Sequence, residues 1–252
     1  MKILYVVRNL DRYSGAATQA LNLAREINNN KVLVDIVNVS DSEKLRTLAA
    51  DIDGVSINHL SRKPAGLLSF FKIVFKYDVV HFHGMFIVHM LIAKLVGKKV
   101  VLKTTLSGED DFSAIHKRIF GRLRIAILNR IVDINNSLTS DLAIVNSGYM
   151  PKSSIVTIPN FVSVNESDVK KINLFIFVGA IVKRKHPLKA INYFLDNYAH
   201  LEESMLYLVG PSNIQENVED AVYLSEIIEK SRQHPDKVVL TGNLAHEEVL
   251  KL

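Results

Sequence analysis

The stretch of sequence that decides the fold is Leu174–Pro187, LFIFVGAIVKRKHP. Its apolar run ends at Gly179, and Lys185 follows shortly before a segment with a helical pattern. A strand that ends in a glycine turn and leads into a helix favours anion binding, because backbone N–H groups and the helix dipole point at the ligand. We therefore predict that Gly179–His186 binds a diphosphate together with Lys185. The alternative is a solvated basic turn.

Apolar runs alternate with helical patterns on both sides of this loop. Such alternation is typical of parallel sheets with helices on both faces. A polar segment, Asn165–Lys171, separates two series of these elements. The sequence thus predicts an α/β protein with two Rossmann-like parallel-sheet domains, 1–165 and 166–252. Because the chain ends at Leu252, the second domain is expected to be incomplete.

The individual elements follow from the two periodicities, alternating or continuous apolar runs for strands and a 3.6-residue repeat for helices. The predicted strands are Lys2–Val7, Val32–Val39, Val55–Asn58, Val79–His83, Lys99–Thr105, Asp141–Val145, Ile155–Ile158, Leu174–Val178, Met205–Val209 and Lys237–Thr241. The predicted helices are Ala16–Asn29, Gly66–Lys76, Phe86–Val96, Ser113–Val132, Pro187–Tyr198, Asp220–Arg232 and His246–Leu252.

Composition narrows the class of protein. Hydrophobic residues make up 48% of the chain, enough for a packed core. There is no cysteine, which excludes disulfides and thiolate metal sites and fits a reducing compartment. Met1 leads directly into a strand-like run, so no signal peptide is expected, and no apolar run is long enough to span a membrane. A cytoplasmic location is therefore expected.

The segment Ser113–Val132 is basic in a chain whose net charge is +5. Apolar residues recur at every fourth position within it, which predicts a single amphipathic helix. One interpretation is a core-packed helix with a solvated basic side. The other is a helix that rests on the anionic inner face of a membrane. Nucleic acid is not expected, because no recognisable binding module accompanies the segment. It contains no acid, and its basic residues are His116, Lys117, Arg118, Arg122, Arg124 and Arg130.

The order of motifs resembles the retaining GT-B glycosyltransferases of the large group 1 family, glycosyltransferase family 4. The resemblance implies two Rossmann-like domains that transfer a hexosyl group from a nucleotide sugar to a glycan or lipid-linked acceptor. It further implies no cofactor, no metal and a role in surface polysaccharides such as lipopolysaccharide. The motifs are MKILYVVRNLDRYSGAATQALNLAREI (1–27), DVVHFHG (78–84), IPNFV (158–162), FVGAIVKRKHP (177–187), LYLVGPS (206–212) and VVLTGNLAHEEV (238–249).

On the donor side, the resemblance implies that cations and backbone N–H groups neutralise the charge of the leaving nucleoside diphosphate. Lys185 stands where the family has its lysine, whereas Ala180 replaces the usual arginine and Arg184 is expected to compensate. The implied catalytic residues are thus Lys185 and Arg184. The implied donor-binding residues are Gly179, Lys185, Gly210, Pro211, Gly242 and Asn243.

On the acceptor side, the implied residues follow three predicted strands. Ser14 has a second interpretation as the N-cap of the first helix, and His83 as a hydrogen-bonded histidine at a strand end. A metal site at the histidines is not expected. The acidic run could equally be a solvated helix start. The implied acceptor-side residues are Ser14, Gly15, His83, Ser107, Glu109 and Asp110.

Two other classes of function stay open. One is a non-catalytic acceptor- or partner-binding subunit, with a second chain completing the second domain. The other is a nucleotide-sugar epimerase or hydrolase on the same fold. The family's pair of glutamates, separated by seven residues, is absent from the sequence. Little or no transferase activity is therefore expected of the 252-residue chain alone.

Overall fold

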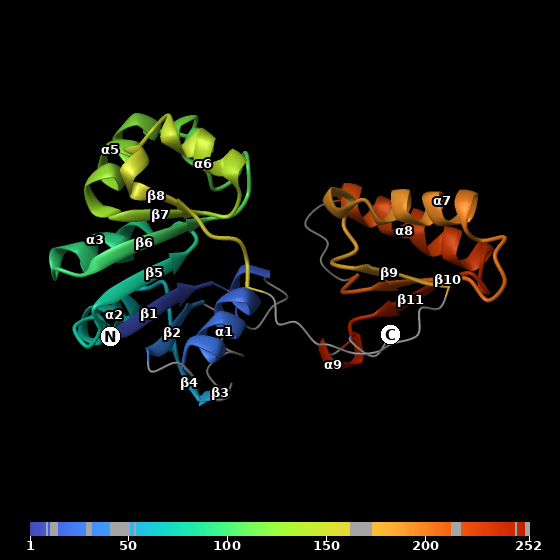
Figure 1. Cartoon of the computed structure of the whole chain (residues 1–252), viewed down its shortest axis with the longest axis horizontal. Coiled ribbons are helices and arrows are strands. Elements are labelled where there is room, and N and C mark those ends of the chain that lie inside the picture. The colour runs from blue at the N-terminus through green and yellow to red at the C-terminus, as the bar shows by residue number, and fades with distance from the viewer. Residues whose placement is uncertain are drawn as a thin grey trace. The chain divides into compact units, whose positions relative to one another are not determined.

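The computed structural model describes residues 1–8, 10, 15–28, 32–40, 51–52, 54–161, 173–212, 218–244 and 246–249. The chain divides into two compact units, Met1–Ser163 and Val164–Leu252, called unit 1 and unit 2 below. Both are α/β with parallel strands, as predicted (Figure 1). The predicted linker Asn165–Lys171 lies outside the described residues.

Unit 1 is built on one eight-stranded sheet in the order β3-β4-β2-β1-β5-β6-β7-β8. Seven strands are parallel, and β3 pairs antiparallel with β4. The strands are β1 Lys2–Val7, β2 Leu33–Val39, β3 Asp51–Ile52, β4 Val55–Leu60, β5 Val79–His83, β6 Lys99–Thr104, β7 Ile134–Ser137 and β8 Ile155–Thr157. The helices are α1 Gly15–Asn28, α2 Pro64–Val74, α3 Ile87–Leu95, α4 Phe112–His116, α5 Gly121–Ile131, α6 Ser140–Ser147 and the 3₁₀ turn η2 Lys152–Ser154.

The core of unit 1 has two layers because strand side chains alternate between the faces of the sheet. Tyr5 and Val7 pack with the alanines of α1 on one face. Leu4 and Val6 point to the other face, where they pack with apolar side chains of α2, α3 and α5 such as Phe70. The continuous apolar strands predicted from the sequence therefore reflect burial on both faces.

Strand β7 and helix α6 differ from the prediction. The sequence Asp141–Val145 was expected to be a strand, which is wrong: it lies inside α6. The hydroxyl of Thr139 caps this helix by accepting a hydrogen bond from the Leu142 N–H at 3.3 Å. The strand is instead the polar Ile134–Ser137, whose lack of apolar residues concealed it.

A buried hydrogen-bond network compensates for the polarity of β7. The amide nitrogen of Asn146 donates to Asn135, Ser137 and Thr104, each at 3.0 Å. The oxygen of the same amide accepts the Phe112 N–H at 2.9 Å. All these partners are buried, so Asn146 joins α6 to β6, β7 and α4 through satisfied polar groups.

The basic segment Ser113–Val132 is two helices, not the single helix predicted. Helix α4 ends at His116, and α5 begins at Gly121 after Phe120, which adopts the left-handed conformation with φ 57°. A Cβ on Gly121 would lie 1.9 Å from the His116 carbonyl, so glycine permits the close turn. The break shifts the helix face, and the expected apolar stripe is therefore wrong: Leu123 is exposed.

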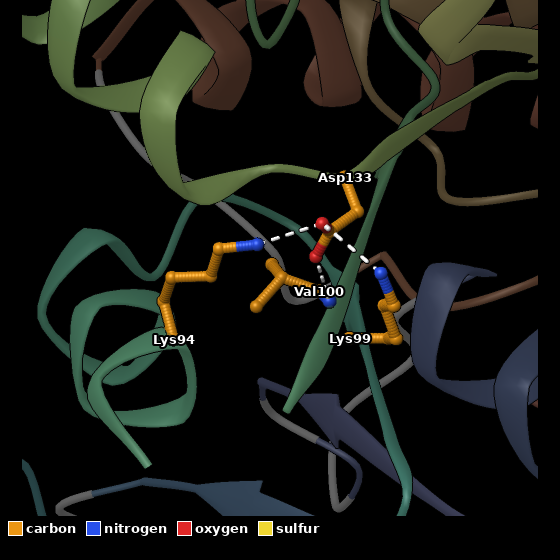
Figure 2. Close-up of polar contacts among 4 residues, drawn as sticks. All are labelled: Lys94, Lys99, Val100 and Asp133. Atoms are coloured by element: carbon orange, nitrogen blue, oxygen red, sulfur yellow. Dashed lines mark hydrogen bonds and ion pairs between the residues drawn. The ribbon is translucent and has the colours of Figure 1, made fainter. Parts of the chain in front are cut away.

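Asp133 fastens the opposite end of this region, between α5 and β7 (Figure 2). Its carboxylate accepts hydrogen bonds from Lys94 Nζ at 2.6 Å and from the Val100 N–H at 2.8 Å, and Lys99 Nζ lies 3.9 Å away. Burial raises the pKa of Asp133, but these hydrogen bonds and the lysine charges outweigh it and hold the pKa below its ordinary value. The carboxylate thus ties α3, β6 and the start of β7 together.

Unit 2 has a three-stranded parallel sheet in the order β11-β10-β9. Helices α7 and α8 lie on one face of it, with Ile191, Phe194 and Ile227 in the core (Figure 1). On the other face Val178 is 62% exposed. Among the described residues the helices that form this core lie on one face of the sheet, whereas the sequence favoured helices on both. The elements are β9 Leu174–Val178, the 3₁₀ turn η3 Lys183–Lys185, α7 Pro187–Asn197, β10 Met205–Val209, α8 Val218–Gln233, β11 Val238–Gly242 and α9 His246–Val249.

Candidate functional site

The predicted donor-side residues lie together at the carboxyl ends of β9, β10 and β11. Backbone hydrogen bonds join the three turns: the Gly179 N–H donates to Val209 at 2.9 Å, and the Gly210 N–H donates to Gly242 at 2.8 Å. The Ile181 N–H adds a bond to the carbonyl of Pro211 at 3.0 Å. In open parallel sheets this edge is where ligands bind.

Gly210 is required at this edge by a close approach of two turns. A Cβ built on it would lie 2.1 Å from the Gly179 carbonyl oxygen, far inside van der Waals contact. Its φ of 147° is also one that other residues rarely adopt. Any other residue at position 210 would push the turns after β9 and β10 apart.

The basic turn η3 presents three exposed cations with different surroundings. Lys183 forms an ion pair with Glu219 of α8, and this hydrogen bond and charge raise the pKa of Lys183 above its ordinary value. Arg184 and Lys185 make no side-chain hydrogen bond or ion pair with another described residue. Within the described part of the chain Lys185 is therefore an unpaired cation on the turn that follows Gly179 and β9, whereas Lys183 is already paired.

The amino end of α7 is more occupied than the sequence suggested. Pro187 has no N–H, and the Leu188 N–H donates to the hydroxyl of Tyr223 at 3.2 Å. The N–H groups of Lys189 and Ala190 both donate to the carbonyl of His186, at 3.0 and 3.3 Å. An anion at this loop would therefore rely on side-chain cations and on the turns of the sheet edge more than on the helix start.

On unit 1, His83 lies at the carboxyl end of β5 in a stack of rings. Its ring centroid is 4.4 Å from that of His81 and 4.9 Å from that of Tyr5. His83 is only 7% exposed, and neither of its two buried ring nitrogens has a hydrogen-bond partner among the described residues. Within that part of the chain the structure therefore does not support the alternative interpretation as a hydrogen-bonded strand-end histidine.

Lys103 is a functional candidate that the sequence reasoning missed. It lies beside His83 in register on β6, is 5% exposed, and donates to the side-chain oxygen of Asn160 at 2.7 Å. Burial lowers the pKa of Lys103, and no described carboxylate pairs with it. A lysine inside an otherwise apolar strand, VVLKTT, was the signal that could have identified it.

Burial and positive charge keep the neighbouring histidines neutral. Burial, with the charge of Lys103, lowers the pKa of His81 to about 3. Burial also lowers the pKa of His83 well below its ordinary value, with contributions from His81 and Lys103. The carboxyl edge of β5 and β6 therefore offers uncharged imidazole next to a buried ammonium group.

The acidic run after β6 is mostly engaged in local structure. Asp111 caps α4 by accepting the Ala114 N–H at 2.7 Å. Asp110 accepts hydrogen bonds from Thr105 and from the Leu106 N–H at 2.7 Å. Burial raises the pKa of Asp110, although these bonds oppose the shift. Asp111 is therefore at a helix start, as that interpretation required, but it is 1% exposed and not solvated.

The other acceptor-side residues are less constrained by contacts. Ser107 and Glu109 are exposed on the same loop. Gly15 begins α1, with nothing within 4 Å of a Cβ placed on it, and Ser14 lies outside the described residues. Arg8, at the end of β1, lies over the ring of Phe86 at 5.2 Å from its centroid.

Two further features concern the part of the chain that the structure describes. No three His, Asp or Glu residues there are grouped so that they could hold a metal ion. No helix in that part has the length and apolar character needed to cross a bilayer.

Comparison with known proteins places the fold. No protein-family model and no curated protein matches the chain by sequence. Anabaena HepE in complex with UDP-glucose is similar in structure with a TM-score of 0.70 and 14% identity, over 97% of this chain and 70% of HepE. A glycosyltransferase from Rickettsia africae gives a TM-score of 0.66 and 13% identity, over 97% of this chain and 68% of that one. UDP-N-acetylglucosamine 2-epimerase from Rickettsia bellii gives a TM-score of 0.55 and 12% identity, over 100% of this chain and 71% of the epimerase. The fold is of the GT-B type.

Proposed function

We propose that the chain transfers a hexosyl group from a nucleotide sugar to a glycan or lipid-linked acceptor in surface-polysaccharide assembly. The observation that carries the proposal is the edge of unit 2, where Gly179, Gly210 and Gly242 lie at three hydrogen-bonded strand ends and the following turn η3 carries Lys185, which pairs with no described residue. A similar fold binds UDP-glucose in HepE, at an identity too low to carry residue roles.

In this proposal Lys185 is the catalytic cation, aided by Arg184, and the glycine turns hold the donor diphosphate. Charge that develops on the leaving diphosphate is stabilised by preorganised cations and N–H groups, so the reaction runs without a bound metal. We further propose transfer with retention of configuration and a cytoplasmic location, which the cysteine-free sequence supports. NMR of the product anomer, with and without a chelator, tests these points.

On the acceptor side we propose His83, with Lys103 beside it. Among the described residues both nitrogens of the His83 ring are without partners, and the Lys103 ammonium has only an amide oxygen as partner. Buried polar groups without partners are costly to keep, which is why they favour a functional role. Ser107, Glu109 and Asp110 stay acceptor-side predictions.

The donor site can be tested by calorimetry with UDP, using two lysines of the same turn. Lys185→Ala should weaken UDP binding by about 1.5–3 kcal/mol, the range for a charge-assisted hydrogen bond. Lys183→Ala removes the same charge from the same turn, but its ammonium is paired with Glu219, so we expect little change. Equal losses in the two variants would contradict a specific role for Lys185.

A second candidate function is a nucleotide-sugar epimerase or hydrolase, favoured by the likeness to the Rickettsia bellii epimerase. Incubation of the protein with UDP-sugars and no acceptor separates the two. Conversion of the sugar, or steady release of free sugar in the absence of acceptor, would favour the second candidate. A binding subunit completed by a partner chain stays a prediction.

A further inference from the structure

The turn between α4 and α5 and the first residues of α5, together 117–123, expose three large apolar side chains close together in the sequence. Ile119 is 78% exposed, Phe120 74% and Leu123 59%. They come from one turn and the first helical residues after it, so they form one projection, called the α4–α5 tip below. Clustered exposed apolar groups ringed by polar residues mark interaction sites.

The backbone conformation of Phe120 is also energetically unfavourable. Phe120 has φ 57° and ψ 28°, a left-handed conformation that is unfavourable for a residue with a bulky side chain. Glycine or asparagine would adopt it more easily. An aromatic side chain that is both strained and exposed stabilises nothing in the folded unit, which indicates that it acts on something outside it.

The positive charge around the α4–α5 tip indicates an anionic partner. Lys117, Arg118 and Arg122 are exposed beside the apolar side chains, and there is no acid from Phe112 to Val132. Lys117 and Arg122 form no ion pair with any residue of the described part. An apolar tip with a basic rim complements a bilayer whose surface is anionic and whose interior is apolar.

We propose that the α4–α5 tip docks unit 1 on an anionic phospholipid bilayer. Ile119, Phe120 and Leu123 enter the headgroup region, and Lys117 and Arg122 bind lipid phosphates. The membrane contact is thus the insertion of a tip, and not a helix lying flat on an apolar stripe. Arg118 serves mainly within the protein, since its guanidinium donates to the Glu109 carbonyl at 2.6 Å.

That Arg118 bond links the tip to the loop that carries Ser107 and Glu109. Docking would therefore bring the acceptor-side loop to the lipid surface. Resting on the transfer reaction proposed above, this favours a lipid-linked acceptor over a soluble glycan. Vesicle binding itself requires no transfer activity, so failure of one proposal is distinguishable from failure of the other.

The chain has no tryptophan, so Phe120→Trp provides a single fluorescent reporter at the tip. With vesicles of phosphatidylcholine and phosphatidylglycerol at low salt, we expect a blue shift and quenching by brominated lipid. Added salt should reverse both, and pure phosphatidylcholine should give much weaker signals. The matched control is Val222→Trp on α8, which replaces a 65% exposed side chain near Glu219 and Glu226 and should show no shift.

Two further variants separate docking from folding. Phe120→Gly should leave the unfolding temperature unchanged or raise it, while vesicle binding falls about tenfold or more. Lys117→Gln and Arg122→Gln should each weaken binding about fivefold, from roughly 1 kcal/mol per basic residue. An unshifted Phe120→Trp spectrum at low salt, as expected of a tip that binds an acidic protein instead, would overturn the proposal. So would unchanged binding by Phe120→Gly.

Discussion

Unit 1 packs helices on both faces of eight strands, whereas the described part of unit 2 packs two helices on one face of three strands. The larger core has room for polar groups. Among the described residues, every buried polar or charged side chain except Ser204 belongs to unit 1. In unit 2 the charges of Lys183, Arg184 and Lys185 are all at the surface.

The difference separates two ways of building a polar site. In unit 1, burial sets the chemistry: His83 and Lys103 are desolvated and their protonation is altered by their surroundings. In unit 2, turn geometry sets the chemistry of the site: the glycines allow backbone groups to approach closely, and the cations remain exposed to water. The two units should therefore respond differently to pH, to core substitutions and to loss of single charges.

Acid should produce the largest difference. His81 and His89 have pKa values of about 3 and about 4, lowered first by burial and then by the charges of Lys103 and Arg8 respectively. Below pH about 6.5 the unfolded chain takes up protons that folded unit 1 does not, so its stability falls as pH falls. The slope is about 1.4 kcal/mol per pH unit for each such histidine, and it continues down to the folded pKa.

The histidines of unit 2 whose side chains the structure describes, at positions 186, 200 and 234, are exposed. Urea unfolding at pH 7 and pH 5, read by hydrogen exchange of peptides from each unit, measures both slopes. NMR titration checks the cause, because His81 and His83 should stay neutral at pH 5. Equal pH dependence in the two units would remove the comparison.

Core truncation should expose the difference in size. Phe82→Ala in unit 1 and Phe194→Ala in unit 2 each empty a buried aromatic site and should cost about 3–5 kcal/mol. Because the core of unit 2 is smaller, we expect Phe194→Ala to unfold unit 2 outright, while Phe82→Ala leaves unit 1 folded but weakened. Hydrogen exchange resolved by unit would show it. If unit 2 of Phe194→Ala stays protected from hydrogen exchange, its core contributes more stability than its small size predicts.

The smallest effect concerns the carboxylate of Asp133. Asp133→Asn should cost about 1–2 kcal/mol at neutral pH, since the hydrogen-bonded pair with Lys94 is lost. The pKa of Asp133 is below its ordinary value, so its contribution is complete above pH about 4 and is lost as pH falls through the folded pKa. Lys99→Gln, at 3.9 Å from the carboxylate, is the matched control and should change little.

The Asp133 contribution starts to be lost near pH 4, whereas the histidine contribution starts to be lost near pH 6.5, so the difference between wild type and Asp133→Asn isolates the carboxylate. Thermal unfolding of wild type and Asp133→Asn at neutral pH and near pH 3 is the measurement. A difference that persists unchanged at the lower pH would show that packing, and not the charge of Asp133, carries it.

The sequence was sufficient wherever burial was apolar. The strands at Lys2–Val7, Val79–His83 and Leu174–Val178 were predicted with the observed bounds, because continuous apolar runs leave little choice. The prediction from sequence failed where buried polar side chains hydrogen-bond to one another. The strand Ile134–Ser137 depends on Asn146 for its partners, and a residue that far along the chain cannot be identified as a partner from periodicity.

The site was predictable to a similar extent. The glycine turns and Lys185 follow from local sequence, so their grouping at one edge could be anticipated from the topology of parallel sheets. The pairing of Lys183 with Glu219 and the burial of Lys103 beside His83 depend on register and on contacts between elements. Those contacts decide which cation is free, and single-chain patterns do not contain them.

The contact between Gly179 and Gly210 has a mechanical consequence. With the space for a Cβ filled by a carbonyl oxygen, and with backbone bonds from Gly179 to Val209 and from Ile181 to Pro211, the turns after β9 and β10 cannot slide past one another. The two turns must therefore move together as one rigid unit. A ligand that displaces either turn has to displace both, so a backbone displacement at Lys185 should also move Pro211, through backbone contacts and not through side chains.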